Sequence, residues 1–191
     1  MYTMSSANGQ PLILKQGAQP LAHYPHARVA GGLIFVSGIS SRRLDNTYEG
    51  VTYVPDGTFR LDIRAQTKAV LENIKLWHSI DEILQSTGAS LKNVVDLTVF
   101  LVDMEDYAAF NEVYNTFFSA ETGKQTHIIY GQDAAQCMRF HQNYSCNYQI
   151  LTYVAIWFVI DLGPSRTTVA VKELPSPKLL IEIKATALAS V

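Results

Sequence analysis

The chain has few cysteines, no long apolar run and no visible secretion signal, so nothing places it among disulfide-rich, membrane or secreted proteins. Only two of its 191 residues are cysteines, Cys137 and Cys146, and their spacing fits neither a CxxC redox motif nor a paired zinc motif. We interpret them as incidental thiols. The longest apolar run, at 153–160, is far shorter than the roughly 18 residues of a membrane-spanning helix. No secretion signal opens the chain, so a cytoplasmic location without a membrane partner is expected.

The chain also has little net charge. Fifteen Lys and Arg residues against seventeen Asp and Glu residues give a net charge of -2, which argues against a broad surface for nucleic acid or anionic lipid. The motifs of dinucleotide, nucleotide, zinc-protease and serine-hydrolase sites are absent. His23 and His26 are three residues apart without a third ligand, so we interpret them as surface histidines rather than as a metal site.

The residues that are present predict one α+β domain over residues 1–191. With 48% hydrophobic residues, the chain can bury a full core. Strand and helix periods alternate, which predicts a sheet with two helices on one face. Asp62 can cap the first helix, Gly88 can end it, and Asp103 can cap the second. The expected elements are an edge strand at 12–14, a strand at 33–37, a helix from 63, a strand at 95–102, a helix ending near 119, and strands at 167–171 and 179–185.

Two side chains have the chemistry of a site. Arg166 lies at the N-terminal end of a predicted strand, where its guanidinium could hold a carboxylate through two parallel hydrogen bonds. The alternative is a solvated surface arginine. Glu182 lies among apolar residues of a strand with a buried pattern, so its carboxylate is either paired or held for proton transfer.

Four segments, in order along the chain, carry the pattern of a known family. They are GLIFVSG at 32–38, the stretch 88–103, FNEVY at 110–114 and IEIKA at 181–185. Together they resemble the RidA/YjgF/UK114 family. The resemblance implies a chorismate-mutase-like α+β subunit, with a mixed sheet and two helices on one face. It also implies homotrimers or dimers of trimers with sites in the clefts between subunits, and neither a metal nor an organic cofactor.

Other segments are most similar to the 2-aminomuconate deaminase branch of that family. They are YPHAR at 24–28, SSR at 40–42, RTTVAV at 166–171 and LLIEIK at 179–184. The branch implies an aminohydrolase of aromatic or tryptophan catabolism that converts 2-aminomuconate, an amino dicarboxylate, to 2-oxohex-3-enedioate and ammonia.

The resemblance also implies roles for individual residues. Arg166 resembles the arginine that binds the substrate carboxylate, and Glu182 resembles the acid that orients water. Thr168 stands where many family imine hydrolases have a reactive cysteine, which favours the specialised branch. The remaining substrate-binding positions are Tyr24, Gly38, Asn111 and Thr168, with Arg28, Arg42 or Arg43 available for the far carboxylate.

Two other functions remain open from the sequence. One is a broad deaminase of 2-iminobutanoate and 2-iminopropanoate. The other is a non-enzymatic trimer that binds ligands, acts as a chaperone, or has the RNA-directed role ascribed to some relatives; the acidic balance weakens the RNA version.

Residues 124–162 differ from the rest of the chain. They have no clean helical or strand period before their apolar end, and an insertion of this length in a compact domain is rare. Codons for Gly123-Lys124 and Leu162-Gly163 can contain a splice donor and a splice acceptor. Joining the flanks merges the two glycines into one, so that 40 codons, those for 124–163 in effect, are removed and a continuous Thr-Gly-Pro-Ser-Arg is left. We therefore hypothesise a translated intron. The alternative is a genuine insertion that caps the cleft or mediates a contact.

Overall fold

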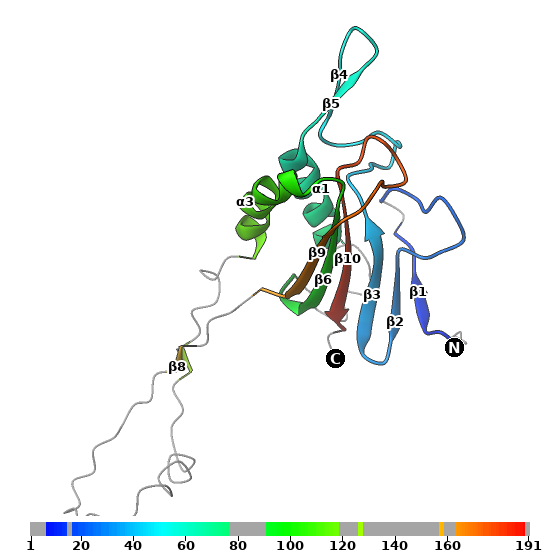
Figure 1. Ribbon diagram of the computed structural model, residues 1–191. Helices are drawn as coiled ribbons and strands as arrows, with labels where there is room; N and C mark the ends of the chain where they lie inside the picture. The colour runs from blue at the N-terminus through cyan, green and yellow to red at the C-terminus, as the bar shows by residue number, and fades with distance from the viewer. Residues whose placement is uncertain are drawn as a thin grey trace, which may run out of the picture. The chain divides into compact units, whose positions relative to one another are not determined.

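The computed structural model describes residues 7–14, 17–76, 91–118, 126–127, 157–158 and 163–189. The chain divides into two compact units. The larger comprises Met1–Ser119 and Gly163–Val191, and the smaller comprises Ala120–Leu162. The sheet and helices that carry the predicted site residues all belong to the larger unit (Figure 1).

The larger unit contains a six-stranded sheet in the order β1-β2-β3-β10-β6-β9 (Figure 1). Strands β6 and β9 run parallel, and all the other neighbouring pairs are antiparallel. The prediction of a mixed sheet is therefore confirmed. The strands are β1 (Gln10–Leu12), β2 (Ala27–Ala30), β3 (Leu33–Ile39), β6 (Val94–Leu101), β9 (Ser165–Ala170) and β10 (Ile181–Leu188).

Two helices lie on one face of this sheet, α1 (Ile63–Leu76) and α3 (Tyr107–Phe117) (Figure 1). As predicted, Asp62 caps α1, because its Oδ1 accepts hydrogen bonds from the backbone N–H groups of Arg64 and Ala65. Asp103 caps the short 3₁₀ turn η2 (Met104–Asp106), which directly precedes α3. The predicted helix end at Gly88 lies outside the described residues. In the described part of the chain, no helix is both long and apolar enough to cross a membrane.

The core lies between the helices and the sheet. Alternate residues of the two central strands face the helices, as the period of a strand requires. Burying these apolar side chains is the main force that holds the layers together. The fully buried members include Leu97, Val99 and Leu101 of β6, Ile181 and Ile183 of β10, Val70, Leu71 and Ile74 of α1, and Phe110 of α3.

The structure differs from the predictions near the N-terminus. Residues 1–32 were expected to hold one edge strand, yet β2 also forms there, with Ala27 opposite Val36 of β3. Its sequence, Ala-Arg-Val-Ala, has little strand period, so its pairing with β3 decides its conformation. Strand β3 continues through Gly38 to Ile39, beyond the strand end predicted at residue 37. Its pairing with β10 has one extra residue between Val36 and Ile39, which is a bulge beside Gly38.

Two short hairpins complete the described elements. In the larger unit, β4 (Val51–Tyr53) pairs with β5 (Phe59–Leu61). In the smaller unit, β7 (Thr126–His127) pairs with β8 (Trp157–Phe158). The rest of the segment interpreted as a translated intron lies outside the described residues.

Candidate active site

The carboxyl group of Glu182, on β10, lies against Gly38 at the bulge of β3. A Cβ atom added to Gly38 would lie 2.7 Å from Cδ of Glu182, so the absent side chain leaves the space that the carboxyl fills. Burial raises the pKa of Glu182. The ion pairs among the described residues do not include Glu182. Because its pKa is raised, this carboxyl group is better suited to exchange protons with a ligand than an ordinary surface carboxylate.

A pocket of about 70 Å³ lies beside Gly38. It is bounded by the end of β3, by the loop that precedes β2, and by α1. Tyr24, Gly38 and Arg42, three of the predicted site residues, line it together. Asn73 of α1 also lines it, and its side-chain amide donates a 3.1 Å hydrogen bond to the Ser40 carbonyl. Sequence reasoning missed Asn73, because nothing distinguishes it from the other polar residues of an amphipathic helix.

His26 is a buried structural residue, which corrects the prediction of a surface histidine. The residue is 6% exposed. Nδ1 accepts a 3.1 Å hydrogen bond from the backbone N–H of Leu14, which leaves Nε2 to donate to the Ala18 carbonyl at 3.0 Å. The hydrogen-bond network thus assigns a neutral ring that holds the loop in front of β2. No group of three metal-binding side chains occurs within the described ranges.

Arg166, on β9, lies against the aromatic face of α3. Its Cζ is 4.4 Å from the ring centroid of Tyr114 and 5.1 Å from that of Phe110. Its Nη2 donates a 3.2 Å hydrogen bond to the hydroxyl of Tyr107. The ion pairs of the described chain do not include Arg166. The rings therefore hold the guanidinium by cation–π contacts, and its N–H groups other than the one bonded to Tyr107 can donate to a carboxylate.

Asn111 and Thr168 accompany Arg166. The pKa of Tyr107 is lowered by two neighbours. The larger cause is a hydrogen bond from the Asn111 side chain, and the second is the positive charge of Arg166. Thr168 is on the same face of β9 as Arg166, and its Oγ1 is buried without a hydrogen-bond partner in the described part of the chain. The aromatic residues of α3 were visible in the sequence as a stripe with helical spacing. The sequence alone could not show their contact with Arg166, because that contact depends on the position of β9.

The predicted site residues form two groups, whose central residues, Arg166 and Glu182, face opposite sides of the sheet. Arg166 is opposite Leu97 in the β6–β9 register, so it faces the helices. Glu182 is opposite Phe100 in the β6–β10 register, so it faces away from them. We call Glu182, Gly38, Tyr24 and Arg42 the Glu182 group, and we call Arg166, Asn111, Thr168 and Tyr107 the Arg166 group.

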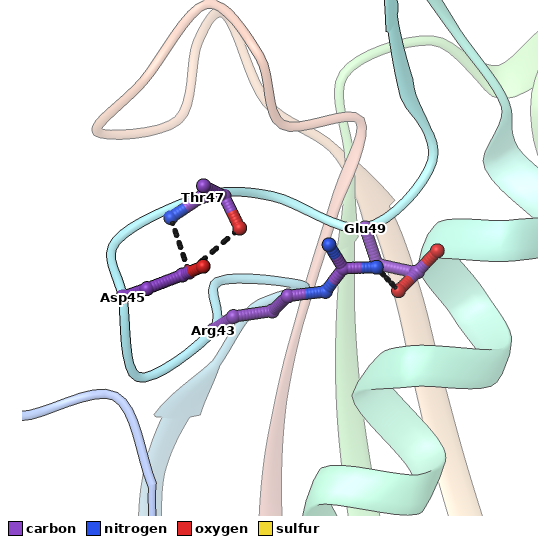
Figure 2. A network of polar contacts seen from close by, with 4 residues as sticks. All are labelled: Arg43, Asp45, Thr47 and Glu49. Carbon is purple, nitrogen blue, oxygen red and sulfur yellow. Dashed lines mark hydrogen bonds and ion pairs between the residues drawn. The ribbon is translucent and has the colours of Figure 1, made fainter.

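Two predicted arginines belong to neither group. Arg28 donates a 2.7 Å hydrogen bond to Asn8 Oδ1 and a 3.1 Å hydrogen bond to the Gly9 carbonyl, next to β1. Arg43 forms an ion pair with Glu49 across a loop (Figure 2). Neither side chain lines the pocket beside Gly38.

Comparison with known proteins agrees with this architecture. The family described as Endoribonuclease L-PSP matches residues 15–189. The RutC family protein of Pyrococcus abyssi is 36% identical over 107 residues, which cover 56% of this chain and 72% of the relative. The 3-aminoacrylate deaminase RutC of Acinetobacter baylyi is 40% identical over 111 residues, which cover 58% and 76%.

Solved structures show the same fold at lower identity. E. coli TdcF with bound serine has a TM-score of 0.57 and 21% identity, and the match covers 95% of this chain and 99% of TdcF. The YjgF gene product of E. coli has a TM-score of 0.56 and 20% identity, with 94% and 98% covered. Since the family match spans almost the whole chain and the fold agrees with it, the chain belongs to the Endoribonuclease L-PSP family, which is the RidA/YjgF/UK114 family that the sequence resembled.

Proposed function

We propose that the chain is an aminohydrolase that converts 2-aminomuconate to 2-oxohex-3-enedioate and ammonia. The observation that carries this proposal is the half-buried carboxyl of Glu182, which has a raised pKa and lies against Gly38 at the edge of a pocket. The relationship to a 3-aminoacrylate deaminase supports the general reaction, which is loss of ammonia from an enamine or imine acid.

The reaction needs an acid–base group and a carboxylate clamp. The substrate first becomes its 2-imine, as the amino nitrogen loses one proton and the far carbon of the diene gains one. Glu182 then takes a proton from water as the oxygen attacks the imine carbon, and passes it to the imine nitrogen. The hydroxyl of the resulting carbinolamine loses its proton, which Glu182 transfers to the nitrogen as the C–N bond breaks. Arg166 holds the carboxylate next to the reacting carbon, which fixes its position for attack. Water enters, ammonia leaves, and no electrons are transferred.

The opposite placement of the two groups supports a site shared between copies of the chain. One sheet presents Arg166 and Glu182 to different sides, so a substrate that meets both would lie between Arg166 of one copy and Glu182 of another. The face that carries Glu182 also exposes Phe35, Val169 and Leu188, at 41%, 40% and 49%. Burying such side chains favours association. We therefore propose a homotrimer or a dimer of trimers.

The test is an ammonia-release assay on the purified chain. The proposed substrate is compared with 2-iminobutanoate and 2-iminopropanoate made in situ. Preference for the dicarboxylate supports the proposal, preference for the small iminoacids supports the broad deaminase, and no release from any of them would refute both. Arg166→Ala is expected to cost about 2–5 kcal/mol of transition-state binding, as for a buried charge that loses its partner. Arg166→Lys, which keeps the charge without the planar fork, is the matched control.

A further inference from the structure

We infer that Arg42 binds a second carboxylate, at the far end of the substrate, and that this contact makes the enzyme selective for dicarboxylates. The inference rests on the proposed function and deepens it. Of the three arginines that the sequence offered for this role, Arg43 is paired with Glu49 and Arg28 is bonded to Asn8 and Gly9. Arg42 alone of the three lines the pocket beside Gly38.

The guanidinium of Arg42 is held in place by neutral acceptors. Nη1 donates a 2.6 Å hydrogen bond to Asn46 Oδ1, and Nη2 donates a 2.5 Å hydrogen bond to the Gln19 carbonyl. An arginine has five N–H donors, so these two hydrogen bonds orient the guanidinium group and leave further donors for a ligand. The ion pairs of the described residues do not include Arg42. Its charge is therefore positioned in advance and is not neutralised by a carboxylate of those residues.

The pocket itself has the chemistry of an anion site. Its lining contains no Asp or Glu, while Arg42 is accompanied by the hydroxyl-bearing residues Tyr24 and Ser40. The hydrogen bonds of His26 leave that ring neutral, so Arg42 is the one charged side chain of the lining. The volume of about 70 Å³ is several times the roughly 10–15 Å³ that holds one water. A carboxylate and part of its carbon chain therefore fit.

Gly38 is the residue that this pocket shares with the proposed reacting centre at Glu182. It forms part of the pocket wall, and it contacts the Glu182 carboxyl. A substrate whose imine carbon is at Glu182 would thus extend past Gly38 toward Arg42. In this arrangement Arg166 of another copy binds the near carboxylate and Arg42 binds the far one.

Binding of two inert ligands tests the inference without any turnover. Hexa-2,4-dienedioate and hexa-2,4-dienoate differ only in whether the far end is a carboxylate or a methyl group. The full chain should bind the dienedioate about 10- to 100-fold more tightly than the dienoate, as expected for a hydrogen bond to a charged group. In Arg42→Met this preference should disappear in a calorimetric titration, whereas Arg42→Lys should keep part of it. Equal preferences in the wild type and in Arg42→Met would overturn the inference.

Two matched variants separate anion binding from a structural role. Arg43→Met removes the neighbouring charge and should keep the full preference. Asn46→Gly removes one internal acceptor of Arg42, and glycine tolerates the φ of 65° found at this position. If Arg42 serves only to brace the loop, Asn46→Gly will lose as much preference as Arg42→Met, and the inference fails. A wild type that shows the binding preference but releases no ammonia would contradict the proposed function and leave the Arg42 site standing.

Discussion

Arg166 and Glu182 face opposite sides of one sheet, although β6 alone separates their strands. The parallel register with β6 turns Arg166 toward the aromatic rings of α3, and the antiparallel register turns Glu182 toward Gly38. We therefore expect one small substrate to meet both side chains only where two copies of the chain come together.

Mixed oligomers test whether the site is shared. Arg166→Ala and Glu182→Gln should each be nearly inactive, with kcat of the second reduced by about 10²- to 10⁴-fold. When the two variants are mixed equally and allowed to reassemble, about a quarter of the sites should combine an intact Arg166 with an intact Glu182 from different copies. Recovery of about a quarter of the wild-type ammonia release is expected. If activity stays at the level of the separate variants, the site lies within one chain or subunits do not exchange, and fluorescence transfer between labelled subunits distinguishes the two.

Gly38→Ala should displace the Glu182 carboxyl. The added Cβ would occupy the space of the carboxyl, which is the movable end of a flexible side chain, so the fold should be retained. We expect kcat to fall by about 10- to 100-fold while the thermal unfolding midpoint changes little. A double-mutant cycle is the control: in a Glu182→Gln background, Gly38→Ala should have little further effect on kcat. Equal losses in both backgrounds would show that Gly38 acts independently of Glu182.

The pH dependence of stability should reveal the buried carboxyl. Because burial raises the pKa of Glu182 in the folded chain, the folded state binds more protons than the unfolded state between the two pKa values. The stabilisation that the folded state gains from the proton on Glu182 is therefore lost as pH rises through the folded pKa. Glu182→Gln should be as stable as the wild type near pH 4 and more stable near pH 8, in urea unfolding at about those values. An unchanged difference across this range would mean that Glu182 has an ordinary pKa.

The pH dependence of kcat/KM in the ammonia-release assay should show the same ionisation of Glu182. Since Glu182 must be ionised to accept a proton from water, kcat/KM should rise with pH through its raised pKa. An acid limb at or below the ordinary glutamate pKa would contradict the role of Glu182 as the base.

Gln66 and Thr67 allow a direct comparison of how a bonded and an unbonded buried polar side chain affect the free energy of unfolding. Both are fully buried on α1. The Gln66 side chain donates to the Lys178 carbonyl at 2.8 Å and accepts from the Leu180 N–H at 2.9 Å, so it holds the segment that leads into β10 and Glu182. Gln66→Leu should cost about 2–4 kcal/mol, because two backbone groups lose their partners. Thr67 Oγ1 has no hydrogen-bond partner in the described structure, so Thr67→Val should be neutral or stabilising in the same denaturation experiment. Similar losses in both variants would contradict this.

Removal of residues 124–163 should leave a foldable chain. A Cβ added to Gly163 would lie 3.2 Å from Cβ of Phe118, so the chain leaves α3 and re-enters before β9 at neighbouring points. Residues 119–123 would then link Phe118 to Pro164, a connection of ordinary length. We expect the shortened chain to keep its thermal midpoint and at least the ammonia release of the full chain. Loss of activity with retained folding would instead support a genuine insertion that caps the site.

Transcript sequencing tests the intron hypothesis itself. We expect messages in which the codons for 124–163 are absent. A message that uniformly retains them, with the intact segment in the purified protein, would refute the hypothesis.

Local patterns in the sequence were enough to predict the cap of α1 at Asp62, the alternation of β6, and the unusual position of Glu182 in a buried strand. Each depends on residues that are close along the chain, where side-chain period and hydrogen-bonding chemistry act directly. The family patterns at 32–38, 166–171 and 181–185 added the fold and the expected roles of Arg166 and Glu182.

Only the tertiary structure decided how these residues are grouped. Alternation tells which residues of one strand share a face, but the register between strands decides that Arg166 and Glu182 face opposite ways. The pocket likewise joins segments far apart in sequence, so the choice of Arg42 over Arg28 and Arg43 required their contacts. The sequence by itself determined the elements and the chemistry of the candidate residues. Long-range pairing decided which of them can act together, because packing and register depend on contacts between distant parts of the chain.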